Sequence, residues 1–425
     1  MLDVKKIREE TELVRKGLEG KHAAAKLDEL LEIDKERRKL IVETDNLKAE
    51  KNSVSDKIGS IKKSGGNADE LIATMKAQGV RLKEMDEQLK AIDAAFDKLM
   101  ESLPNLPHES VPVGRTSDDN VEVRRWLPEG FSFENAQKPK DHLELGKQLN
   151  ILDFERGTKI SGSGFPLYKG KGATLERALI NYMLDLHINE HGYSEIIPPL
   201  LVNSDSMFGT GQLPKMEEDM YYMERDGLWA IPTAEVPVTN IHRNEILSEK
   251  ELPIKYVAYS PCFRREAGSY GKDSKGFLRT HQFNKVEMVK FVKPETSYNE
   301  LELLVNDAED ILKALKIPYR ILMLCTGDLS FAAAKCYDIE TWSPAENKWL
   351  EASSCSNFES FQARRAAIKF RADGDKKSEF LHTLNGSGLA TSRLMVSILE
   401  NYQTPEGKIV VPEPLRKYTG FEIID

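Results

Sequence analysis

A repeating pattern of apolar residues between residues 27 and 103 constrains the fold of this 425-residue chain more than any other feature. From Met75 onward, large apolar side chains recur with the three- and four-residue spacing of a coiled-coil seam. The segment 30–54 carries a thinner version of the same stripe. Gly59 and the run SGGN at residues 64–67 separate the two segments and predict a break in the helix. The sequence therefore predicts an antiparallel helical hairpin roughly 45–50 Å long.

Lysines crowd the half of this predicted hairpin that lies nearest its tip. The net charge of −9 would disfavour a polyanionic partner only if the basic residues were spread evenly. A slender basic arm suits the backbone and shape of folded RNA better than a base sequence. The alternative is oligomerisation, because heptad seams often join helices of separate chains. The candidate RNA-binding residues are Lys48, Lys51, Lys57, Lys62 and Lys63.

A proline-rich segment follows the hairpin and indicates a domain boundary. Its three prolines fix the backbone and predict a rigid, extended linker over residues 104–114. We therefore expect one domain at 1–103 and a second at 115–425. In the second domain, helices such as 172–191 are interspersed with strands that show no regular βαβ repeat. This pattern predicts an antiparallel sheet flanked by helices, and an α+β fold for the whole chain.

Composition narrows the cellular setting. No run of about 18 apolar residues could span a membrane, so we expect no membrane association. The N-terminus lacks a basic segment followed by an apolar one, which favours a cytoplasmic location. The four cysteines form no C-x-x-C pair, which argues against a zinc knuckle or a disulfide framework.

The strongest chemical signal lies in the run PCFRREAGSYGKDSKGFLRTHQFNKVEM. It reads as two strands joined by a polar, glycine-rich loop at 268–276, which could cover an anion and release it. Alternation along the strands predicts one face that presents Arg264, Glu266, Arg279 and Phe283. Guanidinium groups bind phosphate oxygens, and an aromatic ring can stack on a purine. The alternative is a hairpin whose charged side chains form surface ion pairs.

This run closely resembles motif 2 of the class II aminoacyl-tRNA synthetases, in the form found in seryl-tRNA synthetases. Other marks of the family follow in the expected order. HGYSEIIPPL at 191–200 resembles motif 1, and GSGLATSR at 386–393 resembles motif 3. TAE at 233–235 resembles the amino-acid-recognition tripeptide, and EASSCSN at 351–357 is similar to the metal-bearing strand. The resemblance covers essentially the whole chain, up to YTGFEII near its end.

The resemblance implies an ATP-dependent ligase that joins L-serine to tRNA(Ser). Serine and ATP would first give seryl-adenylate and pyrophosphate, and the seryl group would then pass to the terminal adenosine of the tRNA. The selenocysteine tRNA is a further acceptor that the resemblance leaves open. Neither step needs a nucleophilic side chain, so the protein would supply cations and alignment. The resemblance also implies a homodimer and a requirement for Mg²⁺ with ATP, and it gives no reason to expect zinc.

Within the family pattern, the nucleotide is bound by cations, an aromatic ring and a carboxylate. Arg264 would hold the α-phosphate and Arg393 the γ-phosphate, which makes these two the expected catalytic residues. Phe283 would stack on adenine, and Glu266 would bind its amino group. The ATP-binding residues implied by the resemblance are Arg264, Arg265, Glu266, Arg279, Phe283, Glu351, Ala352, Ser353, Ser354 and Arg393.

The resemblance also implies a metal site and a serine site. Glu351 and Ser354 would ligate Mg²⁺, a cation that prefers oxygen ligands. A buried polar pocket would recognise serine, with Glu287 as the expected partner of its hydroxyl. The implied serine-binding residues are Thr233, Ala234, Glu235, Arg264, Glu287 and Ser387.

Other functions remain to be weighed against this one. HINEH at 187–191 matches the H-x-x-E-H pattern of a zinc protease, but motif 1 explains the same region without a metal. A synthetase-like RNA-binding protein without catalysis should have lost some phosphate-binding residues, and this chain retains them. A relative that charges a carrier protein would lack the helical arm.

Overall fold

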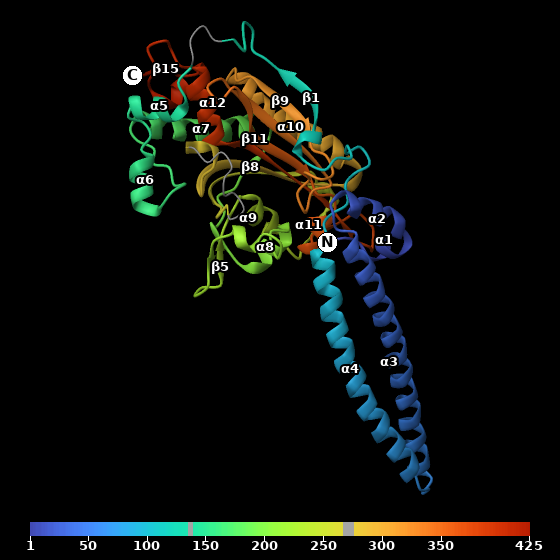
Figure 1. The fold of residues 1–425 in the computed structure, drawn as a ribbon. Coiled ribbons are helices and arrows are strands. Elements are labelled where there is room, and N and C mark those ends of the chain that lie inside the picture. Colours follow the sequence, from blue (N-terminus) through green and yellow to red (C-terminus); the bar gives the residue numbers. More distant parts are fainter. Residues whose placement is uncertain (135–138, 267–275) are drawn as a thin grey trace. The chain divides into compact units, whose positions relative to one another are not determined.

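The computed structural model describes residues 1–134, 139–266 and 276–425. The chain divides into two compact units, Met1–Pro104 and Asn105–Asp425 (Figure 1). No helix in the described ranges is long and apolar enough to cross a membrane.

The first unit is built around two long helices, α3 (Ala25–Lys63) and α4 (Asp69–Ser102), which pair as a hairpin (Figure 1). This confirms the predicted hairpin and its turn at 64–67. The predicted break at Gly59 is wrong, because Gly59 lies inside α3. An interior glycine costs only about 1 kcal/mol relative to alanine, which is too little to end a helix that packs along its length.

The two helices pack through a seam of apolar and polar side chains. Leu82, Met85 and Phe96 of α4 are buried, as the periodicity predicted. Arg37 on α3 places its guanidinium 5.0 Å from the centre of the Phe96 ring and pairs with Asp93 at 2.5 Å. At Arg37, the seam of α3 therefore binds α4 by charge and ring contacts as well as by apolar burial.

Two short helices, α1 (Val4–Glu9) and α2 (Thr11–Gly20), precede α3. Arg8 of α1 pairs with the buried Asp34 of α3 at 2.6 Å. Arg15 of α2 pairs with Asp28 of α3 at 2.7 Å, and apolar residues of both short helices are buried. The first unit is thus a hairpin whose open end is closed by two short helices.

The second unit contains an eight-stranded sheet in its described residues, in the order β1-β9-β10-β11-β14-β8-β7-β2. All neighbours pair antiparallel except β2 and β7. This arrangement confirms the predicted antiparallel sheet. The strands are β1 (Val121–Trp126), β2 (Ser194–Glu195), β7 (Ile254–Phe263), β8 (Gln282–Val292), β9 (Tyr319–Met323), β10 (Lys335–Ser343), β11 (Lys348–Asn357) and β14 (His382–Ala390).

Helices flank this sheet and bury its largest apolar cluster, which combines side chains of α7, α10 and α12 with those of the central strands. The predicted helix at 172–191 corresponds to α7. The helices are α5 (His142–Gln148), α6 (Phe154–Ser161), α7 (Lys171–Asn189), α8 (Ser204–Thr210), α9 (Glu235–Thr239), α10 (Ser297–Ala314), α11 (Phe361–Arg365), α12 (Thr391–Asn401) and α13 (Arg416–Thr419).

Smaller sheets extend the second unit. One contains β3, β4 and β5, another contains β6, β12 and β13, and the third pairs β15 with β16. Their strands are β3 (Leu201–Val202), β4 (Tyr222–Met223), β5 (Leu228–Ala230), β6 (Ile246–Ser248), β12 (Lys369–Arg371), β13 (Glu379–Phe380), β15 (Ile409–Val410) and β16 (Ile423–Ile424).

The proline-containing segment at the start of the second unit is bound to that unit. Asn105 is buried, and its side-chain amide donates to the carbonyls of Ala332 and Phe358 at 2.9 and 2.8 Å. The backbone N–H of His108 donates to the Ala334 carbonyl at 2.9 Å. The extended chain predicted here is therefore held in place by hydrogen bonds as well as by its prolines.

Glu176, a buried acid of α7, connects three elements beneath the sheet. Its Oε1 accepts hydrogen bonds from Asn284 of β8 at 2.8 Å and from the Thr391 hydroxyl of α12 at 2.5 Å. Its Oε2 has no hydrogen-bond partner among the residues that the structure describes. Burial raises the pKa of Glu176 to about 7, because a charge there would lose its hydration.

This raised pKa predicts a pH dependence of stability. Between the ordinary glutamate pKa of 4.5 and about 7, the folded protein retains a proton that the unfolded chain releases, so stability falls as pH rises. The contribution is at most about 1.4 kcal/mol per pH unit. Glu176→Gln keeps an amide oxygen for both donors and cannot ionise. Urea unfolding between pH 5 and 8 should therefore show a shallower decline in the variant than in wild type.

The matched control is Glu190→Gln, which removes an exposed carboxylate just beyond the end of α7. An unchanged slope in Glu176→Gln would contradict the buried, protonated carboxyl.

A second prediction concerns the arm. A Cβ at Gly59 would have nothing within 4 Å, whereas Gly65 has a φ of +76°. Gly59→Ala should stabilise the last turns of α3 by about 0.5–1 kcal/mol and slow their amide hydrogen exchange a few-fold. Gly65→Ala should have the opposite effect, because alanine is strained at positive φ. Equal effects from the two changes would show that helix propensity does not control this end of the arm.

Candidate active site

A cavity of about 470 Å³ lies where β8, β11 and β14 approach the first turn of α12. Segments that are far apart in the sequence contribute to its wall. Most of the residues predicted to bind ATP or serine are among them: Thr233, Glu235, Arg264, Glu266, Arg279, Phe283, Glu351, Ala352, Ser353, Ser354, Ser387 and Arg393.

Three predicted residues do not line the cavity. Ala234 is fully buried in a neighbouring apolar cluster. Arg265 has an exposed side chain, and its backbone N–H donates to the Asp219 carbonyl at 2.8 Å. Glu287 lies buried behind the wall, where it pairs with Lys285 and accepts a hydrogen bond from Asn385 at 3.0 Å. Lys285 and Asn385 do line the cavity, so Glu287 is linked to it through them.

The strands of motif 2 are shorter than the sequence predicted. β7 ends at Phe263 and β8 begins at Gln282, so Arg264, Glu266 and Arg279 lie beyond the strand ends. Glu266 has a φ of +52°, which takes the backbone out of the extended conformation. The Arg279 guanidinium nevertheless meets the Glu266 carboxylate at 2.6 Å. The predicted side chains therefore converge through turns, and strand alternation does not place them.

An arginine and an aromatic ring form one wall of the cavity. The guanidinium carbon of Arg264 lies 5.1 Å from the centre of the Phe283 ring, a cation–π distance. The Arg264 Nε donates to the Pro232 carbonyl at 3.3 Å. These contacts hold a positive charge beside a flat apolar surface, the combination that a nucleotide phosphate and base require.

Arg393 reaches the cavity from the first turns of α12. Its Nη1 donates to the Glu351 carbonyl at 2.6 Å and lies 3.5 Å from the Glu351 carboxylate. Its Nη2 contacts the carbonyl of Leu278 at 3.5 Å. Arg393 thus connects α12, β11 and the 3₁₀ turn η5 (Gly276–Leu278).

The opposite end of the cavity is acidic and more deeply buried. Glu235 accepts a hydrogen bond from the side chain of Gln362 at 2.7 Å. Gln362 is itself fixed by bonds with Thr210 and Thr383 at 3.1 and 2.7 Å. Burial, together with the negative charge of Glu287, raises the pKa of Glu235 to about 7. A cationic ligand in this part of the cavity would favour the ionised form of Glu235.

Lys285, Asn385 and Gln362 were not predicted from the sequence. Lys285 could have been found, because it alternates with Phe283 and Glu287 along one strand. Asn385 stands two residues before Ser387 on β14 and offers a similar but weaker signal. Gln362 offers none, since its role depends on contacts between distant segments.

The predicted metal ligands present oxygen atoms to the same region. Glu351 and Ser354 line the main cavity and also an adjoining cavity of about 380 Å³, which contains Asp338 and Glu340. Burial and the charge of Glu351 hold the pKa of Asp338 well above its usual range. A carboxylate and a hydroxyl are suitable ligands for a hard divalent cation, so these residues fit Mg²⁺.

Two further sequence observations concern the polar loop at 268–276 and the H-x-x-E-H pattern at 187–191. The predicted polar, glycine-rich loop at 268–276 lies outside the described residues, except for Gly276. His187 and His191 bring their Nδ1 atoms within 2.9 Å of each other, and the other ring nitrogen of His187 lies 3.3 Å from the Gly388 carbonyl. Burial lowers the pKa of His187 to about 3, so its ring is neutral at physiological pH.

On the arm, Lys48, Lys57, Lys62 and Lys63 have exposed side chains, and Lys51 is partly buried. Lys48 pairs with Asp86 of α4 at 3.2 Å. An ion pair between such exposed groups is weak, so the Lys48 ammonium can still interact with an anionic partner.

Comparison with known proteins places both units in one family. Residues 1–107 match the seryl-tRNA synthetase N-terminal domain, and residues 221–402 match the class II tRNA synthetase core domain for G, H, P, S and T. The serine–tRNA ligase of Chloroherpeton thalassium is 62% identical over 428 residues, covering 100% of both chains. That of Chlorobium phaeobacteroides strain BS1 is 59% identical over 429 residues, again covering 100% of both.

A solved structure agrees with these relatives. The seryl-tRNA synthetase of Pyrococcus horikoshii complexed with ATP superposes with a TM-score of 0.94 at 40% identity, covering 100% of this chain and 99% of that one. The resemblance that the motifs indicated is therefore confirmed over the full length of the sequence. This chain belongs to the seryl-tRNA synthetase family of class II aminoacyl-tRNA ligases.

Proposed function

We propose that this protein activates L-serine with ATP and transfers the seryl group to tRNA(Ser). One observation carries the proposal: three arginines, an aromatic ring and a buried acidic end line a single cavity. The cations suit the phosphates of ATP, and the acidic end suits the ammonium of an amino acid. The relatives that support the proposal are serine–tRNA ligases, and a structural relative was crystallised with ATP.

In the first step, a carboxylate oxygen of serine attacks the α-phosphorus of ATP. The bond from that phosphorus to the bridging oxygen breaks, and pyrophosphate leaves. The attacking carboxylate is already ionised, so the step needs no general base. Arg264 would hold the α-phosphate beside the carboxylate, and Arg393 would hold the far end of the triphosphate. Their contribution is alignment and stabilisation of the negative charge that builds on the phosphate oxygens.

The remaining nucleotide contacts follow from the same wall. Phe283 would stack on adenine, and Glu266, held by Arg279, would accept a hydrogen bond from its amino group. Glu351 and Ser354 would hold Mg²⁺, which neutralises phosphate charge when it is bound.

Selection of serine requires a polar pocket that is complete only with the correct ligand. Glu235 would receive the ammonium group, and Glu287 would act on the hydroxyl through Lys285 and Asn385, which line the cavity. Alanine lacks that hydroxyl and would leave buried groups without a partner, a defect that can reduce activity by roughly 10⁴-fold or more. Threonine adds a methyl group that the wall must exclude.

In the second step, the 3′-hydroxyl of the terminal adenosine of the tRNA would attack the carbonyl carbon of seryl-adenylate. The bond from that carbon to the phosphate oxygen breaks, AMP leaves, and the hydroxyl proton passes to the departing phosphate or to solvent. The lysines near the tip of the arm would bind the tRNA backbone. The protein would act as a homodimer in the cytoplasm. The selenocysteine tRNA is a second acceptor with the same chemistry at its end.

The proposal is tested by ATP–pyrophosphate exchange with each of the twenty amino acids, with Mg²⁺ and without tRNA. We expect exchange with serine alone, at least about 10³-fold above alanine and threonine. A folded protein that binds tRNA but supports no exchange would instead be a non-catalytic RNA-binding relative. The matched variant is Glu287→Gln, which keeps an oxygen for Asn385 but removes the charge. It should raise the KM for serine far more than the KM for ATP, whereas equal increases would contradict the assignment of Glu287.

The arm is tested separately by reversing charge near its tip. The triple variant Lys57→Glu, Lys62→Glu and Lys63→Glu should retain serine-dependent exchange and raise the KM for tRNA at least tenfold. Because fewer phosphates are neutralised, the salt dependence of tRNA binding should also weaken. The control reverses Lys35, Lys39 and Lys98, which are exposed on the half of the arm farther from its tip. Equal loss in both triple variants would show that the net charge of the arm matters and the predicted position does not.

A further inference from the structure

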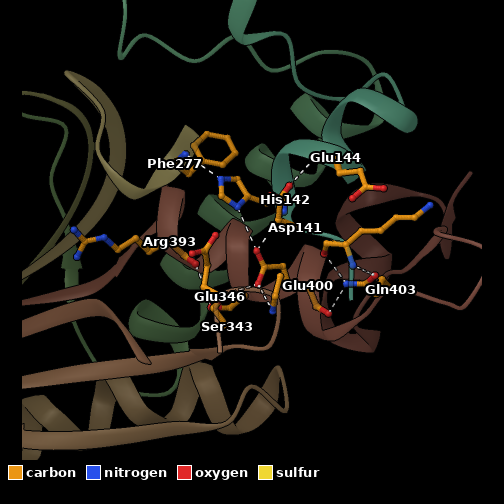
Figure 2. Close-up of polar contacts among 12 residues, drawn as sticks. Asp141, His142, Glu144, Phe277, Ser343, Glu346, Arg393, Glu400 and Gln403 are labelled. Carbon is orange, nitrogen blue, oxygen red and sulfur yellow. Dashed lines mark hydrogen bonds and ion pairs between the residues drawn. The ribbon is translucent and has the colours of Figure 1, made fainter. Parts of the chain in front are cut away.

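A buried histidine that takes no part in the proposed chemistry lies next to the nucleotide end of the cavity. His142, the first residue of α5, is fully buried, as is Glu400 near the end of α12. Figure 2 shows the His142 ring between Phe277 and Glu400. His142 and Glu400 are 258 residues apart in the sequence, and a buried pair of this kind is expected to have a structural or positioning role.

The hydrogen bonds fix the state of the ring. The backbone N–H of Phe277 can only donate, and it lies 3.2 Å from His142 Nε2. Nε2 must therefore be the acceptor, and Nδ1 carries the proton that points to Glu400 Oε1 at 3.3 Å. The other oxygen of Glu400 accepts from the Ser343 hydroxyl at 2.5 Å and from the Ala345 N–H at 3.3 Å. Glu400 thus sets the orientation of the ring, and the ring binds Phe277.

The turn that donates this hydrogen bond is held closely against the ring. Gly276 has a φ of +58°, and a Cβ there would lie 2.3 Å from His142 Nε2. The Phe277 side chain is buried and stacks on Tyr168 with ring centres 5.3 Å apart. The His142 ring also stacks on the Phe277 ring, with centres 5.9 Å apart, so His142 contacts both the backbone and the side chain of this residue.

The turn Gly276–Leu278 supports two arginines of the predicted phosphate site. Arg279 follows Phe277 by two residues and lines the cavity. Arg393 donates to the carbonyl of Leu278, the last residue of the turn, at 3.5 Å. A shift of the Phe277 backbone would move the support of both arginines, whereas the serine end of the cavity contains neither of them.

We propose that His142, oriented by Glu400, is a positioning residue for the nucleotide half of the active site. It acts through the Phe277 N–H on the turn Gly276–Leu278 and thereby on Arg279 and Arg393. The proposal rests on the proposed function, because it assigns this half of the cavity to ATP.

Two substitutions of His142 test its hydrogen bonds to Glu400 and to Phe277 separately. In His142→Asn, the side-chain amide can still donate to Glu400, but nothing reaches the Phe277 N–H. In His142→Gln, the amide oxygen extends to the place of Nε2 and can accept that N–H. The KM for ATP in serine-dependent pyrophosphate exchange should rise about tenfold in His142→Asn and stay within about twofold of wild type in His142→Gln. The KM for serine should change less than twofold in both.

Tyr319→Phe provides the control for stability. It removes a buried hydroxyl that donates to the Glu309 carboxylate at 2.7 Å, and neither residue contacts His142 or the turn, so it should lower the urea midpoint and leave the KM for ATP unchanged. If His142→Asn does not fold, Gly276→Ala displaces the same contact from the turn side and should raise the KM for ATP in the same selective way. Equal KM values for ATP in the two His142 variants, or a parallel rise for serine, would overturn the proposal. Absence of serine-dependent exchange in wild type would refute the proposed function itself.

Discussion

The register of β8 between its two neighbours determines which side chains can reach the active-site cavity. Phe283 pairs with Cys262 of β7, and Glu287 pairs with Ser387 of β14. Because side chains alternate along a strand, a slip of one residue would turn Phe283, Lys285 and Glu287 to the other face. The ring, the lysine and the acid would then be lost from the site together. The rest of the site depends on this pairing, because β11 and α12 are placed relative to β14.

The register of β14 changes where that strand leads into α12. Its pairing with β8 is interrupted between Ser387 and Ala390, and the helix begins at Thr391. A local irregularity of this kind re-aims the backbone at the end of a strand, a common feature beside active sites. Here it allows Ser387 to face the cavity from the strand while Arg393 reaches the cavity from the helix. The antiparallel sheet thus supplies a rigid floor, and its irregular ends supply the charged groups.

Sequence reasoning succeeded where structure depends on local periodicity and failed where it depends on distant contacts. The coiled-coil spacing predicted both arm helices, because each helix packs mainly on the other. It failed at Gly59, where the small cost of a glycine inside a helix was interpreted as the end of that helix. It also failed at Glu266, whose left-handed backbone ends the strand pattern earlier than alternation suggests. Glu176 and Gln362 could not be predicted at all, since each has partners in segments more than a hundred residues away. The motifs predicted the site residues without explaining what holds them.

The buried acids of the cavity show how such a site can favour an amino acid over other ligands. Glu235 and Glu287 are both buried, and their mutual repulsion helps to raise the pKa of Glu235 to about 7. Lys285 pairs with Glu287 and neutralises its negative charge. A second negative charge, on Glu235, would then be uncompensated. An ammonium group supplies the missing positive charge, and it would favour ionisation of Glu235 as it binds. A neutral ligand of the same shape would bind without that gain. This end of the cavity would therefore select ligands that carry an ammonium group, because that group neutralises the buried Glu235. The shape of the pocket would then distinguish only among ligands that carry the ammonium.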